Sequence, residues 1–411
     1  MRWFQATPKG AKGELAGRAD LVTVASAAMA HGRRTAVVAF EAEPARGASV
    51  KSLSRAVAER CARELDDHAT LGRLGGLLFA VVLVDYDDEA AVLDLAYRLR
   101  TAVATRTWCG VATDTVLPPL ANGEQLLGAG LLALTSAREA GDGHIDVCTP
   151  GHLAADRERR ALGRDLGVAL DEQGLEVNYQ PIVNLQNGAV IGFEALVRWT
   201  HPEHGPIPAA EFVAVAEELG LIIELGTRVL SRATTQAQRW SAGNAMPIAI
   251  HVNVSGPELV DPRFVTRVRD SLRLSELPAE QLVVEFPAAV VERHLDIARA
   301  VCADLRRLGV RVAVEDVDPR SSLATDLATL DVAILKVDRR DLTSPEDAFA
   351  LAGARGIAVY GEGIEDEAHR RRLLRYGCHV GQGYLFSRPL AAIEAERYLQ
   401  AHLLAGFREA R

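Results

Sequence analysis

Residues 177–197 read VNYQPIVNLQNGAVIGFEALV, and this stretch holds two short apolar runs, 177–183 and 189–197. Short apolar runs of this kind are typical of buried β-strands. Six further runs follow at 248–254, 282–286, 310–314, 332–337, 357–360 and 380–386. Most are separated by segments with helical periodicity, which predicts an α/β fold with a mostly parallel sheet. Eight such strands favour a closed (β/α)8, TIM-like barrel over an open sheet.

Polar residues lie within or at the end of seven different runs. They are Glu194, Asn253, Glu285, Glu315 with Asp316, Lys336, Glu362 and Gln382. In a barrel these positions converge on one mouth, the face where barrel enzymes place their chemistry. Any single carboxylate at a strand end has an ordinary explanation as a cap or a solvated ion pair. A set that recurs on seven strands predicts one common functional site instead.

The chemistry of this set is oxygen-rich, because most of its members are carboxylates or side-chain amides. Such donors suit Mg²⁺ or Mn²⁺ far better than zinc. Two such ions close together can hold a phosphodiester, generate hydroxide from bound water and stabilise the leaving oxygen. Lys336 would add positive charge beside the attacking water or the phosphate. The residues alone therefore indicate metal-assisted phosphoryl chemistry.

Several segments resemble the motifs of EAL-domain cyclic di-GMP phosphodiesterases. Residues 179–183 (YQPIV) and 194–199 (EALVRW), followed by His201-Pro202, resemble the opening signature of that family. Further matches come in the family's order: 252–255 (VNVS), Glu285, 336–338 (KVD), 362–365 (EGIE), 382–386 (QGYLF) and 389–390 (PL). The resemblance implies a modified eight-stranded barrel that binds the second messenger cyclic di-GMP.

The resemblance also implies a role for each matching residue. The catalytic residues would be Glu194, Lys336 and Glu362, with Lys336 positioning the attacking water. The ligands of one or two Mg²⁺ or Mn²⁺ ions, two if the domain is catalytic, would be Glu194, Asn253, Glu285, Glu315, Asp316 and Glu362. The residues that bind cyclic di-GMP would be Gln180, Leu196, Arg198, Glu365 and Gln382, with Arg198 on a ligand phosphate.

Two departures from the family pattern affect one functional unit. Where the family usually reads Asp-Asp-Phe-Gly-Thr-Gly, residues 315–320 read EDVDPR, so Glu315 replaces a metal-bridging Asp and Pro319 fixes φ. Ala288 stands where the family usually carries a second Glu that steadies the same loop. Catalytic constellations tolerate displacements of only about 0.5 Å. Two hypotheses therefore stay open: a phosphodiesterase with weak or conditional activity, and a non-catalytic cyclic di-GMP receptor that signals through a protein effector.

Residues 1–150 are predicted to form a smaller α/β domain. Apolar runs at 35–40, 77–84 and 109–112 indicate strands, and 50–65 and 89–103 have helical periodicity. A charged helix over 154–170 is expected within a linker, 151–174, that leads to an EAL domain over 175–402.

The segment 73–80 (RLGGLLFA) resembles the signature hairpin of the GGDEF-family diguanylate cyclases. In this chain the acidic pair of the signature is replaced by Leu77-Leu78. The loss of these carboxylates removes metal binding and electrostatic support for phosphoryl transfer. We therefore expect a degenerate cyclase-like domain without diguanylate cyclase activity.

Bulk composition limits the other function classes. The 411 residues carry a formal net charge of −9, which argues against broad attraction to nucleic acid. The five cysteines are scattered without a CxxC pair and are expected to be reduced core residues. No apolar run reaches the roughly 18 residues of a membrane-spanning helix. These features predict a cytoplasmic protein without membrane contact, and we expect a homodimer.

Overall fold

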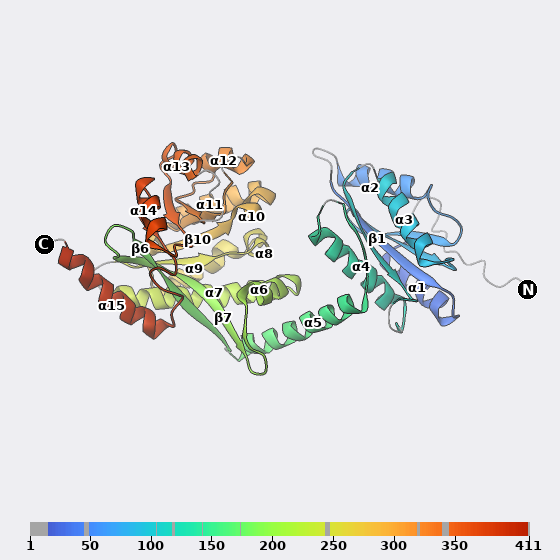
Figure 1. Ribbon diagram of the computed structural model, residues 1–411, viewed down its shortest axis with the longest axis horizontal. Coiled ribbons are helices and arrows are strands. Elements are labelled where there is room, and N and C mark those ends of the chain that lie inside the picture. The colour runs from blue at the N-terminus through green and yellow to red at the C-terminus, as the bar shows by residue number, and fades with distance from the viewer. Residues whose placement is uncertain are drawn as a thin grey trace, which may run out of the picture. The chain divides into compact units, whose positions relative to one another are not determined.

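The structure is a computed structural model that describes residues 15–409 except 45–48, 104, 117–119, 142, 173, 243–246, 319–320 and 339–344. The chain divides into two compact units, Met1–Arg160 and Ala161–Arg411 (Figure 1). The division falls within helix α5 (Pro150–Asp171), which contains the helix predicted over 154–170. Pro319 and Arg320 of the altered loop lie outside the described residues.

The first unit is a five-stranded sheet with helices on both faces. Its elements are α1 (Arg18–Ala30), β1 (Thr35–Ala42), α2 (Val50–Cys61), β2 (Ala69–Gly75), β3 (Leu78–Val84), α3 (Glu89–Ala102), β4 (Thr107–Thr113), α4 (Gly123–Glu139) and β5 (Ile145–Val147). The strand order is β2-β3-β1-β4-β5, with β1 antiparallel to both neighbours. From β1 to β4 this is the βαββαβ arrangement of ferredoxin-like folds.

Strand β1 is apolar along nearly its whole length, without the alternation of apolar and polar residues that a strand with one exposed face has. Its side chains point alternately to the two faces of the sheet. Val38 and Phe40 pack in the core shared with α2 and α3, whereas Val37 and Ala39 pack in the core shared with α1 and α4. Both faces are covered by helices, so every position of the strand except the half-buried Glu41 is buried.

The three predicted strands and two predicted helices of this unit are confirmed as β1, β3, β4, α2 and α3. Strand β2 was not predicted, because its sequence contains two glycines and its residues are mostly half-buried, which hides the period of a strand. The β2–β3 turn places Gly76 at φ +50°, a left-handed conformation that glycine adopts without strain. Leu77 is the second residue of this turn, and Leu78 begins β3.

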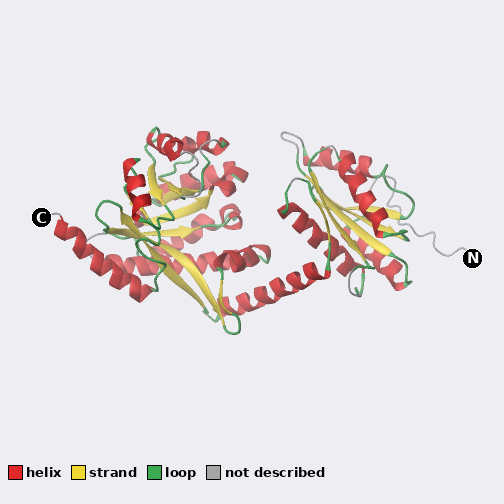
Figure 2. Ribbon diagram, viewed as in Figure 1, coloured by secondary structure: helices red, strands yellow, loops and turns green. Residues whose placement is uncertain are grey.

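The second unit is an eight-stranded barrel surrounded by helices (Figure 2). The barrel strands are β6 (Leu175–Asn184), β7 (Val190–His201), β9 (Ala249–Asn253), β10 (Leu282–Pro287), β11 (Arg311–Glu315), β12 (Ile334–Val337), β13 (Ala358–Gly361) and β14 (Val380–Gly381), and a short ninth strand, β8 (Gly205–Ile207), lies outside the barrel. Its helices after α5 are α6 (Ala209–Glu218), α7 (Ile222–Ala242), α8 (Gly256–Val260), α9 (Phe264–Ser275), α10 (Ala288–Arg293), α11 (Leu295–Leu308), α12 (Ser322–Asp326), α13 (Pro345–Gly353), α14 (Glu367–Arg375) and α15 (Ala392–Glu409). Short 3-10 turns cover Ala279–Gln281 and Leu327–Thr329.

The barrel order is β6-β14-β13-β12-β11-β10-β9-β7, and the pairing of β6 with β7 closes it. Strand β6 is antiparallel to both of its neighbours, whereas all other neighbouring pairs of the barrel are parallel. The expected modified (β/α)8, TIM-like barrel is therefore confirmed for this unit. The small strand β8, which pairs only with β7, was not predicted.

The last predicted run, 380–386, forms a strand only over Val380–Gly381. The chain leaves the ladder after Gly381, because Leu385 donates its backbone N–H to Ile364 of the neighbouring loop, at 2.9 Å. The prediction of a strand through residue 386 was therefore wrong, although the strand itself is present.

Among the described helices, none has the length and apolar character that would be needed to cross a bilayer. All five cysteines are buried and free, which confirms that they are unpaired core residues. Burial raises the pKa of the Cys61 thiol to about 12, so this thiol is inert near neutral pH.

Candidate functional site

The alternation of side chains along the barrel strands creates the candidate site. On β10, Leu282, Val284 and Phe286 pack outward in the large core beneath the helices. Val283 belongs to a separate small cluster on the opposite face, inside the barrel. Glu285 shares this inner face with Val283, because residues two apart along a strand point the same way.

The same rule applies to the neighbouring strands. Ala313 and Ile334 belong to the inner cluster, and each is followed two residues later by a charged residue, Glu315 on β11 and Lys336 on β12. In β9, Ile250 pairs with the outward-facing Leu282 and lies in the outer core. His251 and Asn253 of β9 therefore face inward. The inner-face residues that end these strands, Asn253, Glu285, Glu315 and Lys336, meet at the carboxyl ends of the strands.

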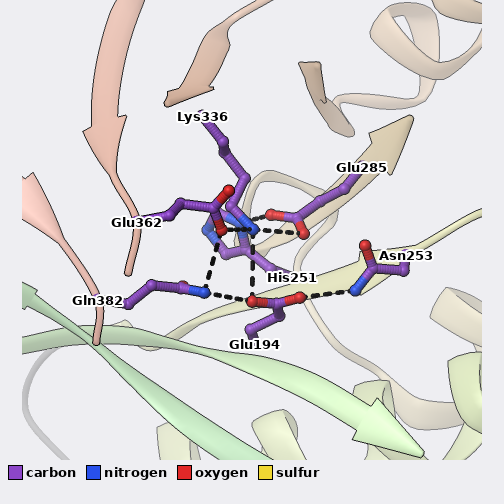
Figure 3. A network of polar contacts seen from close by, with 7 residues as sticks. All are labelled: Glu194, His251, Asn253, Glu285, Lys336, Glu362 and Gln382. Atoms are coloured by element: carbon purple, nitrogen blue, oxygen red, sulfur yellow. Dashed lines mark hydrogen bonds and ion pairs between the residues drawn. The ribbon is translucent and has the colours of Figure 1, made fainter. Parts of the chain in front are cut away.

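Lys336 is the centre of this cluster (Figure 3). Its ammonium lies 2.7 Å from Glu362 Oε1, 2.8 Å from Glu285 Oε2 and 3.4 Å from Glu194 Oε2. The side chain is only 1 % exposed. Burial lowers the pKa of the lysine, but the surrounding carboxylates outweigh it and raise the pKa well above its usual value. Lys336 is therefore a permanent cation among three carboxylates.

Two side-chain amides complete the network. Asn253 donates from Nδ2 to Glu194 Oε1 at 2.6 Å. Gln382 donates from Nε2 to Glu194 Oε2 and, at 3.2 Å, to Glu362 Oε1. Glu194 thus receives hydrogen bonds on both oxygens from residues of three other strands or strand ends, which fixes the plane of its carboxylate.

The loops after β13 and β14 position Glu362 and Gln382. Gln382 donates its N–H to Gly361 O at 2.8 Å, and Ile364 donates its N–H to Gln382 O at 3.1 Å. A Cβ atom on Gly383 would lie 2.2 Å from the backbone N of Ile364. Glycine is therefore required directly after Gln382, because no side chain fits between the two loops.

Burial and charge separate the ionisation of the carboxyl groups. Burial opposes ionisation of Glu194, but Lys336 and the two amides outweigh it, so its pKa is lowered. Burial raises the pKa of Glu285 and of Glu362 to about 7, although Lys336 opposes this rise. Burial raises the pKa of Glu315 to about 8. One carboxylate is thus firmly ionised, while the other three titrate near neutral pH.

These shifts predict a pH dependence of stability in the absence of divalent cations. In the unfolded chain carboxyl groups ionise near pH 4–4.5, whereas Glu285, Glu362 and Glu315 keep protons in the folded state until about pH 7–8. The folded state then binds more protons, so stability falls as pH rises. The lowered pKa values of Glu194 and His251 act in the opposite sense, but only below about pH 6.5.

We therefore expect the free energy of unfolding, measured by urea titration in a chelator, to fall by about 2–4 kcal/mol between pH 6.5 and pH 8.5. Saturating Mg²⁺ should weaken this dependence if a cation binds the ionised carboxylates. A free energy of unfolding that is constant or rises over this range would contradict the assigned ionisation.

The five residues predicted to bind the ligand divide between two hollows at the carboxyl ends of the strands. Gln180, Glu365 and Gln382 line an open cavity of about 530 Å³, together with Glu362 and Tyr384. The other two predicted ligand-binding residues, Leu196 and Arg198, line a second hollow of about 280 Å³. Two predicted metal ligands, Asn253 and Glu315, line the same hollow. Glu194 therefore links the two hollows, because it accepts hydrogen bonds from Gln382 of the first and from Asn253 of the second.

The predicted metal ligands have the chemistry that Mg²⁺ and Mn²⁺ prefer, since all offer carboxylate or amide oxygens. In the described part of the chain, however, no group of three or more His, Cys, Asp or Glu side chains has an arrangement that could hold a metal ion. The physical reason is that Glu194, Glu285 and Glu362 turn toward Lys336. Asp316 follows β11 with φ +58°, a left-handed conformation that Asp tolerates better than most residues.

Two contributors were not predicted from the sequence. His251 lies beside Glu285 in the barrel interior, and it was missed because a histidine in an apolar strand gives no signal of its own. Glu292 on α10 accepts a long hydrogen bond from the N–H of Leu323, at 3.4 Å. Glu292 lies one helical turn after Ala288, the position at which the family usually carries its second Glu. Its contact with Leu323 therefore links α10 to the segment that follows the altered loop.

Comparison with known proteins agrees with this geometry. The EAL domain family model matches residues 163–389, more than half of the sequence, and the chain therefore belongs to the EAL domain family. It is 33% identical over 368 residues to the uncharacterized protein y4lL of Sinorhizobium fredii, covering 85% of this chain and 44% of that protein. It is 30% identical over 360 residues to the bifunctional diguanylate cyclase/cyclic di-GMP phosphodiesterase MucR of Pseudomonas aeruginosa. This match covers 82% of this chain and 52% of MucR.

Among solved structures, PaMucR phosphodiesterase in complex with c-di-GMP is 33% identical, with a TM-score of 0.54. The match covers 57% of this chain and 99% of that one. The chain spans about half the length of the curated relatives that it matches.

Proposed function

We propose that the EAL domain binds cyclic di-GMP at the barrel mouth and hydrolyses it, weakly or conditionally, to the linear dinucleotide in a reaction that depends on Mg²⁺ or Mn²⁺. The observation that carries this proposal is the buried cluster of Lys336 with Glu194, Glu285 and Glu362, which borders an open cavity at the strand ends. The similarity to MucR, named as a cyclic di-GMP phosphodiesterase, supports the choice of ligand.

The divalent ions would be held by Glu194, Asn253, Glu285, Glu315, Asp316 and Glu362, and when bound they would lower the pKa of water and stabilise the leaving oxygen. The ammonium of Lys336 stays protonated, so it can donate hydrogen bonds to the attacking water but cannot accept its proton. Glu362 lines the cavity and has a pKa of about 7, so its carboxylate can accept a proton near neutral pH. Arg198 would contact a ligand phosphate from the second hollow.

A second candidate function is a non-catalytic cyclic di-GMP receptor that signals through a protein effector. The specific observation in its favour is Glu315, whose side chain is one methylene longer than the Asp that the family usually carries. Among the described residues, the carboxylate of Glu315 has no hydrogen-bond or ion-pair partner, and its pKa is raised to about 8. A carboxyl group that is protonated near neutral pH must release its proton before it can bridge two cations, which weakens their binding.

For the first unit we propose a degenerate GGDEF-like domain without cyclase activity. The ferredoxin-like strand order and the β2–β3 turn at Gly76-Leu77 support this. The match to MucR also supports it, because that match extends beyond the part of the chain matched by the EAL family. We further propose the division 1–150, 151–174 and 175–402 for domain, linker and EAL domain. For the whole chain we propose a homodimer and a cytoplasmic location.

The test is incubation of the full chain with cyclic di-GMP and Mg²⁺ or Mn²⁺, with chromatography of the linear product and a parallel binding titration. We expect product with the wild type and with Glu396→Gln, which alters an exposed carboxylate of α15, and none with Glu194→Gln. Binding without product would support the receptor function. An absence of both binding and product would refute both functions.

A further inference from the structure

His251 lies in the barrel interior, on the inner face of β9 and two residues before Asn253. Its side chain is 1 % exposed, and its ring is tilted by 35° against the ring of Tyr360 with the centroids 5.8 Å apart. The Nδ1 atom lies 2.6 Å from Glu285 Oε1 (Figure 3). A histidine in this position is thus buried against a carboxylate that is itself completely buried.

The two oxygens of Glu285 have different partners. Oε1 contacts His251, while Oε2 lies 2.8 Å from the ammonium of Lys336. The two contacts come from β9 and β12, so they fix both the rotation and the tilt of the carboxylate. An apolar residue at position 251 could fill the same space, but it would leave Oε1 buried without a donor, which costs about 1–3 kcal/mol or more for a charged group.

The direction of the hydrogen bond follows from the chemistry of its two atoms. Both a neutral and a protonated imidazole can present an N–H at Nδ1, which lies 2.6 Å from Glu285 Oε1. An ionised carboxylate only accepts hydrogen bonds, and therefore the ring donates from Nδ1 when Glu285 is ionised.

We propose that His251 is a positioning residue for Glu285: its Nδ1–H holds Oε1 at the inner side of the barrel, so that Oε2 faces the strand-end cluster. Such an outer contact fixes the orientation of a carboxylate that ligates a metal, and its loss typically weakens metal binding by about 10- to 100-fold. The inference rests on the proposed function in one respect, that Glu285 is a ligand of the divalent ion.

The first experiment measures Mn²⁺ binding by calorimetry without cyclic di-GMP. We expect His251→Ala to raise the Kd for Mn²⁺ by about 10- to 100-fold. His251→Asn should recover most of the affinity, since its amide can donate from a place close to Nδ1. Ile250→Val alters the same strand on its outer face and should leave the Kd within about twofold. Equal affinities of His251→Ala and wild type, or an Asn variant no better than the Ala variant, would overturn the proposal.

The second experiment separates this inference from the proposed function. Thermal unfolding in a chelator is compared for wild type, His251→Ala, Glu285→Gln and the double variant. If the two groups interact directly, the loss in Tm of the double variant is smaller than the sum of the single losses. Additive losses would overturn the positioning role even where Mn²⁺ binds. Coupled losses in a wild type that binds no Mn²⁺ would refute the metal-dependent function and leave the positioning role intact.

Discussion

Lys336→Met is expected to abolish hydrolysis of cyclic di-GMP and to lower the free energy of unfolding of the metal-free protein by about 3–5 kcal/mol. Methionine has a similar length but no charge, so the carboxylates of Glu194, Glu285 and Glu362 would lose the ammonium that lies within 3.4 Å of each. Like charges that remain buried together disfavour ionisation, and the carboxyl groups would respond by binding protons. The loss in stability should therefore be larger at pH 8 than at pH 6.5.

The measurement is urea unfolding in a chelator at both pH values, together with the product assay. Lys51→Met is the matched control, because Lys51 is exposed on α2 of the other unit. Mn²⁺ should stabilise Lys336→Met more than the wild type, since a divalent cation can replace the missing charge. A Lys336→Met protein that is as stable as the wild type at pH 8 would show that the buried network does not depend on the ammonium.

Glu315→Asp is expected to raise the rate of hydrolysis by about 10- to 100-fold. The side chain of Glu315 is one methylene too long for the position that the family usually fills with Asp, and misplacement by about 1 Å costs up to about 100-fold in rate. The shorter carboxylate would restore the position of a bridging ligand without changing its charge. The affinity for cyclic di-GMP should change little, because the cavity lined by Gln180, Glu365 and Gln382 is unaltered and the hollow that Glu315 shares with Arg198 keeps its carboxyl group.

The rate under saturating substrate and the binding constant are measured separately, so that a change in turnover is not confused with a change in affinity. Glu315→Gln keeps the length of the side chain but removes its charge, and it should hydrolyse no faster than the wild type. If Glu315→Asp binds cyclic di-GMP and still forms no product, the altered loop has lost more than this one contact. The receptor function would then be the better explanation.

The sequence by itself determined the strands of the barrel and the residues at its mouth. Strand runs such as 282–286 could be recognised because one face packs against helices and the other fills the barrel, so few polar residues interrupt them. The site residues stood out for the same reason, since Glu285 and Lys336 are charged residues in otherwise apolar strands. The first unit was predicted less completely, because its edge strand β2 lacks this continuous apolar pattern.

Only the tertiary structure decided how these residues interact. Glu194 and Lys336 are 142 residues apart in sequence, and their contact depends on the closure of the barrel by β6 and β7. The ionisation of the carboxyl groups, the pairing of His251 with Glu285 and the division of the ligand residues between two hollows also depend on distance and burial. These quantities arise from long-range packing, because electrostatic interactions vary with separation and solvent exposure rather than with position along the chain.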